Sequence, residues 1–204
     1  EYKRKKGVED FEGLSGRELQ RKLTLAEITN SMLLKFTLLH SEQKSFFFPY
    51  EGQDQIESAS GAVWRDAIAK DNVKKDFTEQ MIISEKWNNF KTFIIHDSPP
   101  DFCWDIDNGS RKVILGLNCY RATSENYFGS NLVAWFSPDL PIQNGPQEYG
   151  GLPGCILFLE DGKYLYSAVR YKISPEDLDI NFNNSKKKKG KTITFNDFFN
   201  LENG

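Results

Sequence analysis

The chain has 204 residues, a length that suffices for one well-filled hydrophobic core. Its 26 Lys and Arg residues face 29 Asp and Glu residues, for a net charge of -3, which argues against the basic field of a nucleic-acid-binding protein. No window holds the roughly 20 apolar residues of a membrane-spanning helix, and the cysteines and histidines lack zinc-site spacing. We therefore predict one domain over residues 1–204 with no cofactor, no metal site, no nucleic-acid partner and no transmembrane segment.

The order of the elements along the chain indicates a mainly β (α+β) fold. Ser15–Leu25 and Ile56–Lys70 carry apolar residues at helical spacing and predict two helices. Aromatic residues make up 14% of the chain, and they fall in short segments bounded by Gly, Asn, Asp and Pro, as in strands. Short links between strands favour antiparallel pairing, so we predict a curved antiparallel sheet or half-barrel with a few short helices. The predicted strands cover residues 33–39, 45–48, 80–87, 90–96, 102–106, 112–122, 132–136, 155–160 and 163–173.

Two hairpin turns are predicted from Gly-containing pairs. Asn108-Gly109 supplies the two positive-φ residues of a type I′ turn. With the turn there, alternation places Val113, Leu115, Leu117 and Cys119 on one face of the following strand. The second turn is predicted at Asp161-Gly162, between the strand that starts at Cys155 and the strand that carries Leu165.

The C-terminal region contains a polar segment and then a helix signal. Residues 174–191 are polar, proline-interrupted and rich in lysine, and we predict a mobile loop there and near residues 53–60. Thr194 followed three residues later by Asp197 is typical of a helix N-cap. A short closing helix with Phe195, Phe198 and Phe199 is therefore expected.

A stiff connection from Trp135 to Gly154 feeds the strand at Cys155. Proline fixes φ and removes a backbone donor, while glycine permits close approach or a positive φ. In Leu152-Pro153-Gly154-Cys155 this predicts a type II turn. A purely structural role, fixing the register of the strand, is enough to explain this connection. Its stiffness is also typical of a loop that presents a recognition surface. The structural signature comprises Pro141, Asn144, Gly145, Pro146, Gly151, Pro153 and Gly154, and the candidate recognition residues are Trp135, Phe136, Gln147, Tyr149 and Leu152.

Several motifs follow one another in a fixed order over some seventy residues of the chain. They are Trp104-Asp105-Ile106, Ile114–Thr123, Ala134–Pro138, Pro141–Pro146 and Gly151–Gly154. In this order the chain resembles the GLPGLI family of Gram-negative envelope proteins. Weaker similarity includes Tyr2 in a possible first strand and the segment Thr192–Phe198. The chain departs from the family pattern at Cys155, which replaces the usual apolar residue, and at Ser130-Asn131, where a basic residue is common.

The resemblance implies a location and a fold, and it implies no established reaction. It predicts export by a signal peptide that is then removed, residence in the periplasm, at the outer membrane or outside the cell, and a mainly β domain. A co-acting envelope protein, such as an outer-membrane transporter or a secretion component, is the kind of partner that this location suggests. The leading hypothesis is accordingly a non-catalytic binding or accessory protein of the bacterial envelope.

Two other functions stay open at the level of the sequence. His96-Asp97-Ser98 holds the residue types of a hydrolase triad, but adjacent strand residues point to opposite faces. A hydrolase with a site near His96 or Cys119 is one alternative, and no catalytic residue is assigned. A carrier of lipid or peptide in a half-barrel cavity is the other. The three cysteines permit one disulfide, and we predict that Cys103, Cys119 and Cys155 lie mainly inside.

Overall fold

The computed structural model describes residues 1–6, 34–50, 72–88, 91–126, 129–175, 178–180, 182 and 190–203. Within these residues twelve strands form one open sheet in the order β12-β6-β5-β4-β3-β2-β1-β11-β10-β9-β8-β7. The β12–β6 pair is parallel and the other pairs are antiparallel. The mainly β prediction is confirmed, and the sheet is open rather than a closed barrel.

The described strands have between 3 and 10 residues, and one helix ends the described chain. Their bounds are β1 Tyr2–Lys6, β2 Leu34–His40, β3 Lys44–Pro49, β4 Val73–Asp76, β5 Met81–Asn88, β6 Lys91–Asp97, β7 Asp105–Ile114, β8 Leu117–Glu125, β9 Asn131–Ser137, β10 Cys155–Glu160, β11 Tyr164–Ala168 and β12 Lys191–Ile193, and the helix is α3 Phe195–Asn203.

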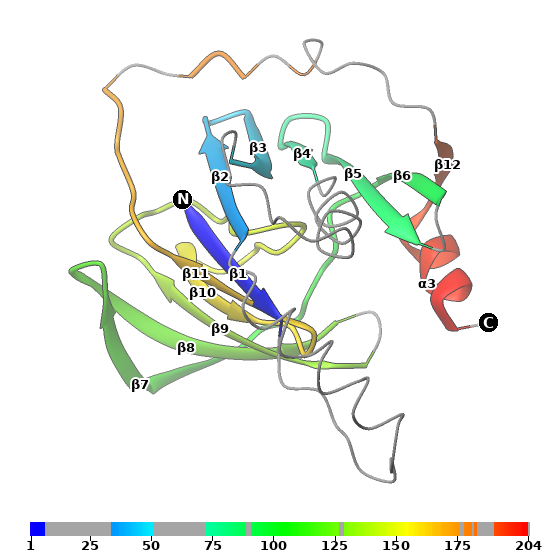
Figure 1. Cartoon of the computed structure of the whole chain (residues 1–204). Coiled ribbons are helices and arrows are strands. Elements are labelled where there is room, and N and C mark those ends of the chain that lie inside the picture. The colour runs from blue at the N-terminus through cyan, green and yellow to red at the C-terminus, as the bar shows by residue number, and fades with distance from the viewer. Residues whose placement is uncertain are drawn as a thin grey trace, which may run out of the picture.

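The sheet curves between β1 and β2, so that its two ends lie on different sides of the molecule (Figure 1). We call β1 and β7–β11 the first half-sheet, and β2–β6 with β12 the second half-sheet. Aromatic side chains join the two at their shared boundary. Phe36 of β2 stacks on Phe47 of β3 with ring centroids 4.9 Å apart, and Tyr2 and Tyr166 meet Phe47 edge-on. All four are at least 97% buried, so a single apolar cluster runs across the bend.

One predicted hairpin is confirmed and the other is wrong. Asp161 and Gly162 turn the chain between β10 and β11, where the Asp161 amide donates to Tyr164 O at 3.1 Å. The other turn lies at Leu115-Gly116, whose φ angles are 53° and 80°, and Asn108-Gly109 lies inside β7. There Asp107 accepts bonds from the Gly109 and Ser110 amides at 2.8 and 3.2 Å.

That correction changes the faces of β7 and β8. The Asp107 contacts stabilise a bulge, because the side chain takes up amides that a hairpin turn would leave to the backbone. The register shifts between Asp107 and Arg111, and Lys112 then pairs with Cys119. Val113 and Cys119 were predicted on one face, but Val113 is 67% exposed and Cys119 is fully buried.

The closing helix begins as predicted. The Asp197 amide donates to Thr194 Oγ1 at 3.1 Å, and the Thr194 amide donates to Asp197 Oδ2 at 3.2 Å. These bonds satisfy amides that the first turn of a helix leaves free. Phe198 packs edge-on against Phe93 of β6 at 5.9 Å, so α3 covers part of the second half-sheet (Figure 1).

Some predictions concern residues that the structure does not describe. The two early helices, Ser15–Leu25 and Ile56–Lys70, and the loop near 53–60 lie outside the described residues. Of the segment 174–191, the described residues include Ile180, which is buried, and Lys191, which begins β12.

Candidate functional site

The connection between β9 and β10, residues Pro138–Gly154, is the candidate site, and we call it the strap. It is folded by its own backbone. Asn144 and Gly150 form an isolated bridge, and the Gly151 amide donates to Gln143 O at 3.2 Å. The amides of Cys155 and Ile156 donate back to the strap carbonyls of Leu140 and Asn144, both at 2.9 Å. The strap is therefore a defined structure that is continuous with the start of β10.

The turn at the end of the strap differs from the predicted type II turn. The Gly154 amide donates to Leu152 O at 2.7 Å, which makes Pro153 the central residue of a γ-turn. The Cys155 amide, which would close a type II turn on Leu152 O, donates to Leu140 O instead. Only a glycine fits at position 154, because the backbone of Ser137 and Pro138 passes close to it. A Cβ there would lie 2.3 Å from Ser137 O and 2.8 Å from Pro138 N. The two ends of the strap are thus in backbone contact.

On the side of the first half-sheet, the strap is held by Asp161 and Trp104. Tyr149 Oη donates to Asp161 Oδ2 at 3.2 Å, and Trp104 Nε1 donates to Gly150 O at 2.8 Å. Asp161 also accepts the Lys163 and Tyr164 amides at 2.9 and 2.6 Å. Burial raises the pKa of the Asp161 carboxyl, and the bonds from those amides and from Tyr149 act in the opposite direction.

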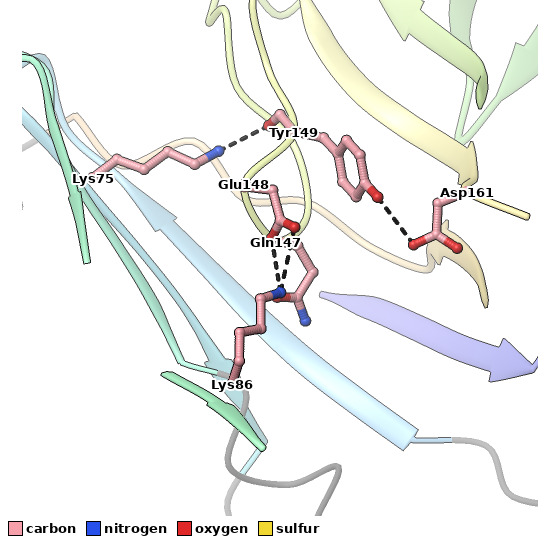
Figure 2. Close-up of polar contacts among 6 residues, drawn as sticks. All are labelled: Lys75, Lys86, Gln147, Glu148, Tyr149 and Asp161. Carbon is pink, nitrogen blue, oxygen red and sulfur yellow. Dashed lines mark hydrogen bonds and ion pairs between the residues drawn. The ribbon is translucent and has the colours of Figure 1, made fainter. Parts of the chain in front are cut away.

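On the side of the second half-sheet, two lysines reach the strap from neighbouring strands (Figure 2). Lys75 Nζ of β4 donates to Asn144 Oδ1 and to Tyr149 O, both at 2.8 Å. Lys86 Nζ of β5 contacts Glu148 Oε2 at 3.0 Å and Gln147 Oε1 at 3.3 Å. Tyr149 connects both sides, because its carbonyl faces Lys75 while its ring points to Asp161 (Figure 2).

Lys75 is an unusual group for a protein interior. Its side chain is 4% exposed and both of its acceptors are neutral. Burial lowers the pKa of Lys75 to about 7, although Glu148 favours the charged form. Near neutral pH this amine therefore exists in both protonation states.

Asn144 is the shared partner of Lys75 and a histidine. Its Oδ1 also accepts the Gly145 amide at 2.9 Å. These two donors fix the orientation of the amide, so Nδ2 is the atom that faces His40 Nδ1 of β2 at 3.2 Å. An amide nitrogen is a donor, and His40 Nδ1 must therefore accept, which requires the neutral imidazole.

Four of the five candidate recognition residues are inside the protein. Phe136, Gln147, Tyr149 and Leu152 are at most 5% exposed, so they do not form a surface in this conformation. Gln147, Tyr149 and Leu152 are buried because the strap turns inward between the half-sheets, and Phe136 is buried because it faces the core from β9. Among the described residues, the buried atoms Gln147 Nε2, Ser45 Oγ and Ser84 Oγ have no hydrogen-bond partner.

Trp135, the fifth candidate, is half-buried on the opposite face of β9. Lys112 Nζ lies 4.1 Å from the centroid of the Trp135 ring and 4.4 Å from the centroid of the Phe158 ring. Register places Arg121 beside Trp135 on the same face. Partial burial lowers the pKa of Lys112. We call Lys112, Arg121, Trp135 and Phe158 the outer patch.

The structure does not bring His96, Asp97 and Ser98 together as a triad. The exposed His96 ring contacts Met81 Sδ at 2.6 Å. Asp97 instead accepts the amides of Ser98 and Phe195 at 2.8 and 3.0 Å, and so fixes the start of α3. His96 lies in the second half-sheet and Cys119 in the first. Among the described residues, no group of three or more His, Cys, Asp or Glu side chains could hold a metal ion.

The three cysteines are free thiols. Cys119 and Cys155 are buried as predicted, whereas Cys103 is exposed, contrary to the prediction. Burial raises the pKa of both the Cys119 and Cys155 thiols, and a raised pKa disfavours the nucleophilic thiolate. No described helix is long and apolar enough to cross a membrane.

The strap partners Lys75, Lys86 and Asp161 were not predicted as site residues. Asp161 had a signal, since a turn aspartate before glycine commonly caps backbone amides. Lys75 and Lys86 had none, because a lysine in a short charged segment is indistinguishable from a surface residue. A covariation between these lysines and the strap would be the signal to look for.

Comparison with known proteins adds two findings. The model of a family described as "Protein of unknown function (Porph_ging)" matches residues 125–158. This match covers β9, the strap and β10 as far as Phe158. No curated protein matches the chain.

The fold is similar to part of a larger protein of known structure. PNGF-II, solved in two space groups, superimposes with TM-scores of 0.55 and 0.54 at 13% and 14% identity. The similarity covers 98% of this chain and 31% or 32% of PNGF-II. The chain thus spans about a third of the length of that protein, and at this identity the similarity concerns the fold alone.

Proposed function

We propose that the chain is a non-catalytic binding or accessory protein of the bacterial cell envelope, and that it binds a protein partner through the outer patch. The proposal includes membership of the GLPGLI family and export by a cleaved signal peptide to the periplasm, the outer membrane or the exterior. The family match at residues 125–158 supports it, because that segment contains the Gly151–Gly154 motif together with Trp135 and Phe158.

The observation that carries the proposal is the double contact of Lys112 with Trp135 and Phe158. The two aromatic residues are half-buried, so each leaves ring surface accessible beside the ammonium. Large amphipathic rings with a cation are the side chains that dominate protein interfaces. Arg121 adds a second positive charge, and a partner surface with carboxylates would complement the patch.

The hydrolase and carrier hypotheses receive less support from the geometry. His96 and Cys119 belong to different half-sheets, and the contacts of each are with its own strand or a neighbouring strand. The space between the half-sheets carries the strap, with Leu152, Gln147 and Tyr149 buried in it. A carrier would need that volume for its ligand.

The test is capture of a partner from the envelope fraction of the native organism. The wild-type chain, Lys112→Glu, Trp135→Ala and a matched control, Lys172→Glu, are immobilised at equal amounts. Lys172 is exposed and lies outside the strands. We expect one envelope protein to be retained by the wild type and the control, and its yield to fall about tenfold or more with each outer-patch variant, as for residues central to an interface. Equal retention by all four chains would contradict the outer patch, and fractionation of the native protein into the cytosol would contradict the location.

A further inference from the structure

The strap's contacts with β2 and β4 meet at one buried side chain, Asn144, whose amide lies between two bases. Asn144 is fully buried, accepts from Lys75 at 2.8 Å and donates to His40 at 3.2 Å. His40 pairs with Ser45, and Ser45 pairs with Lys75, so the two bases lie in one row across β2, β3 and β4. We propose that Asn144, Lys75 and His40 form a proton-operated latch that holds the strap on the second half-sheet above neutral pH and releases it in acid.

The donor and acceptor count favours unprotonated bases. A neutral amine has two N–H groups, which match the two acceptors of Lys75, Asn144 Oδ1 and Tyr149 O. Within the described residues no third acceptor contacts Lys75 Nζ, so the extra proton of an ammonium is unsatisfied in the interior. A neutral imidazole likewise accepts from Asn144 Nδ2 at His40 Nδ1, whereas a protonated imidazole would place the Nδ1–H of His40 against the Nδ2–H of Asn144.

Asn144 cannot accommodate both protonated bases by rotating its amide. In the present orientation Asn144 Oδ1 accepts from Lys75, and the Nδ2 donors face a protonated His40. After a 180° flip of the amide, Oδ1 would accept from His40, and the Nδ2 donors would face Lys75. One contact is therefore lost in either orientation, and since Asn144 is fully buried, surface water does not replace the lost partner.

The charged groups that the described residues place around Lys75 do not compensate for its unsatisfied proton. Glu148 and Cys155 act on Lys75 from the strap and from β10, and both would favour the ammonium if they are charged. Glu148 is already bound by Lys86 of β5 at 3.0 Å, and burial keeps the Cys155 thiol protonated. β3 contributes the neutral Ser45, and Phe77 contributes a ring 5.4 Å from His40.

Release at this point leaves the strap attached elsewhere. Tyr149–Asp161 and Trp104–Gly150 hold it to the first half-sheet. The expected acid form thus has the Asn144 end of the strap detached from β2 and β4 while the β-sheet itself stays folded. Protonation of either base breaks this hydrogen-bond pattern, and we expect the change over about one to two pH units below neutrality.

The Gly145 amide reports directly on the latch, because its acceptor is Asn144 Oδ1 at 2.9 Å. Its hydrogen exchange is measured by NMR on the 15N-labelled chain at about pH 8 and about pH 5.5 and corrected for the intrinsic rate. Protection is expected to fall about tenfold or more in acid. The Lys163 amide, which donates to Asp161 Oδ1, is the internal reference and should change less than about twofold.

Substitutions separate the latch from general acid effects. His40→Gln keeps an acceptor for Asn144 and Lys75→Gln keeps two N–H donors, and neither side chain titrates. The double variant should retain Gly145 protection in acid within about twofold. His96→Gln and Lys74→Gln, the matched controls, should behave like the wild type. If circular dichroism shows that the double variant does not fold, the single variant His40→Gln is measured instead. It should then lose at least half of the acid-induced fall in Gly145 protection, on a logarithmic scale. Constant protection in the wild type, or an undiminished acid response in the folded variant, would overturn the latch.

Discussion

The two sides of the strap are held by different kinds of contact. Toward the first half-sheet it uses backbone bonds, the close approach of Gly154 to Ser137, and the bond from Tyr149 to Asp161. Toward the second half-sheet, the hydrogen bonds that we describe end on three basic side chains, Lys75, Lys86 and His40. The first side depends little on protonation near neutral pH, and the second depends on it directly at Lys75 and His40.

This difference teaches how one connection can serve two purposes. Backbone contacts fix the geometry of the strap relative to β9 and β10, because backbone amides have no protonation equilibrium in this range. Side-chain contacts to buried bases couple the same strap to solvent pH. A variant on the first side should therefore lower the stability at every pH, and a variant of Lys75 or His40 on the second side should change the pH dependence.

The largest effect is expected for Gly154→Ala on the first side. The new Cβ would lie 2.3 Å from Ser137 O, and a backbone oxygen has little freedom to move. We expect the free energy of unfolding to fall by at least about 3 kcal/mol, or the chain to fail to fold. Urea denaturation measures it. Gly129→Ala is the control, because it also has a positive φ but open space around its Cβ. A loss as small as that of Gly129→Ala would show that the strap ends are not in tight contact.

Tyr149→Phe tests the side-chain part of the first side. It removes the 3.2 Å bond to Asp161 Oδ2 and keeps the ring that packs 5.1 Å from Phe102. A hydrogen bond to a buried carboxyl is worth about 2 kcal/mol, and the loss should be similar at about pH 6 and pH 8. Urea midpoints at both values test this. A loss confined to one of them would place Tyr149 among the pH-dependent contacts.

Sequence reasoning predicted the local features of both half-sheets better than their contacts. The β10–β11 turn was predictable because Asp161-Gly162 lies between two clear apolar strands. The β7–β8 turn was not, because Asp107 binds the Gly109 and Ser110 amides and converts an apparent turn into a bulge. Leu115-Gly116 has no such signature, as leucine rarely adopts a φ of 53°.

The strands and site residues that the sequence did not predict were missed for a common physical reason. β4 consists of Val-Lys-Lys-Asp and β12 of Lys-Thr-Ile, and both lack the apolar pattern by which strands are predicted. Lys75 becomes buried only because a strap from residues 138–154 supplies its acceptors. Such a partner is distant in sequence, and pattern reasoning on one chain does not reach it. The strap was recognised as stiff, but the direction in which it turns depends on the curvature of the whole sheet.

Lys75 should give the second side its own pH dependence. The folded-state pKa of about 7 lies below the unfolded value of about 10.4, so the unfolded chain binds more protons between these values. Stability attributable to Lys75 therefore rises with pH above 7 and is constant below it. Relative to Lys75→Met, the wild type should gain about 1.5 kcal/mol between pH 7 and 8.5. Paired urea titrations at the two values measure this gain, and parallel behaviour of the two chains would mean that Lys75 is not titrating there.

The smallest effect is expected where a charge pair lies near the surface on the second side. Lys86 and Glu148 side chains are 17% and 15% exposed, and their closest atoms are 3.0 Å apart. Glu148→Gln keeps the shape and removes the charge, and we expect a loss of about 1 kcal/mol. A double-mutant cycle with Lys86→Met isolates the pair. Because solvent ions reach a partly exposed pair, the coupling should shrink in about 0.5 M NaCl, whereas the effect of Gly154→Ala should not. A coupling that is unchanged by salt would instead mean that the strap shields this pair from solvent as fully as it shields Lys75.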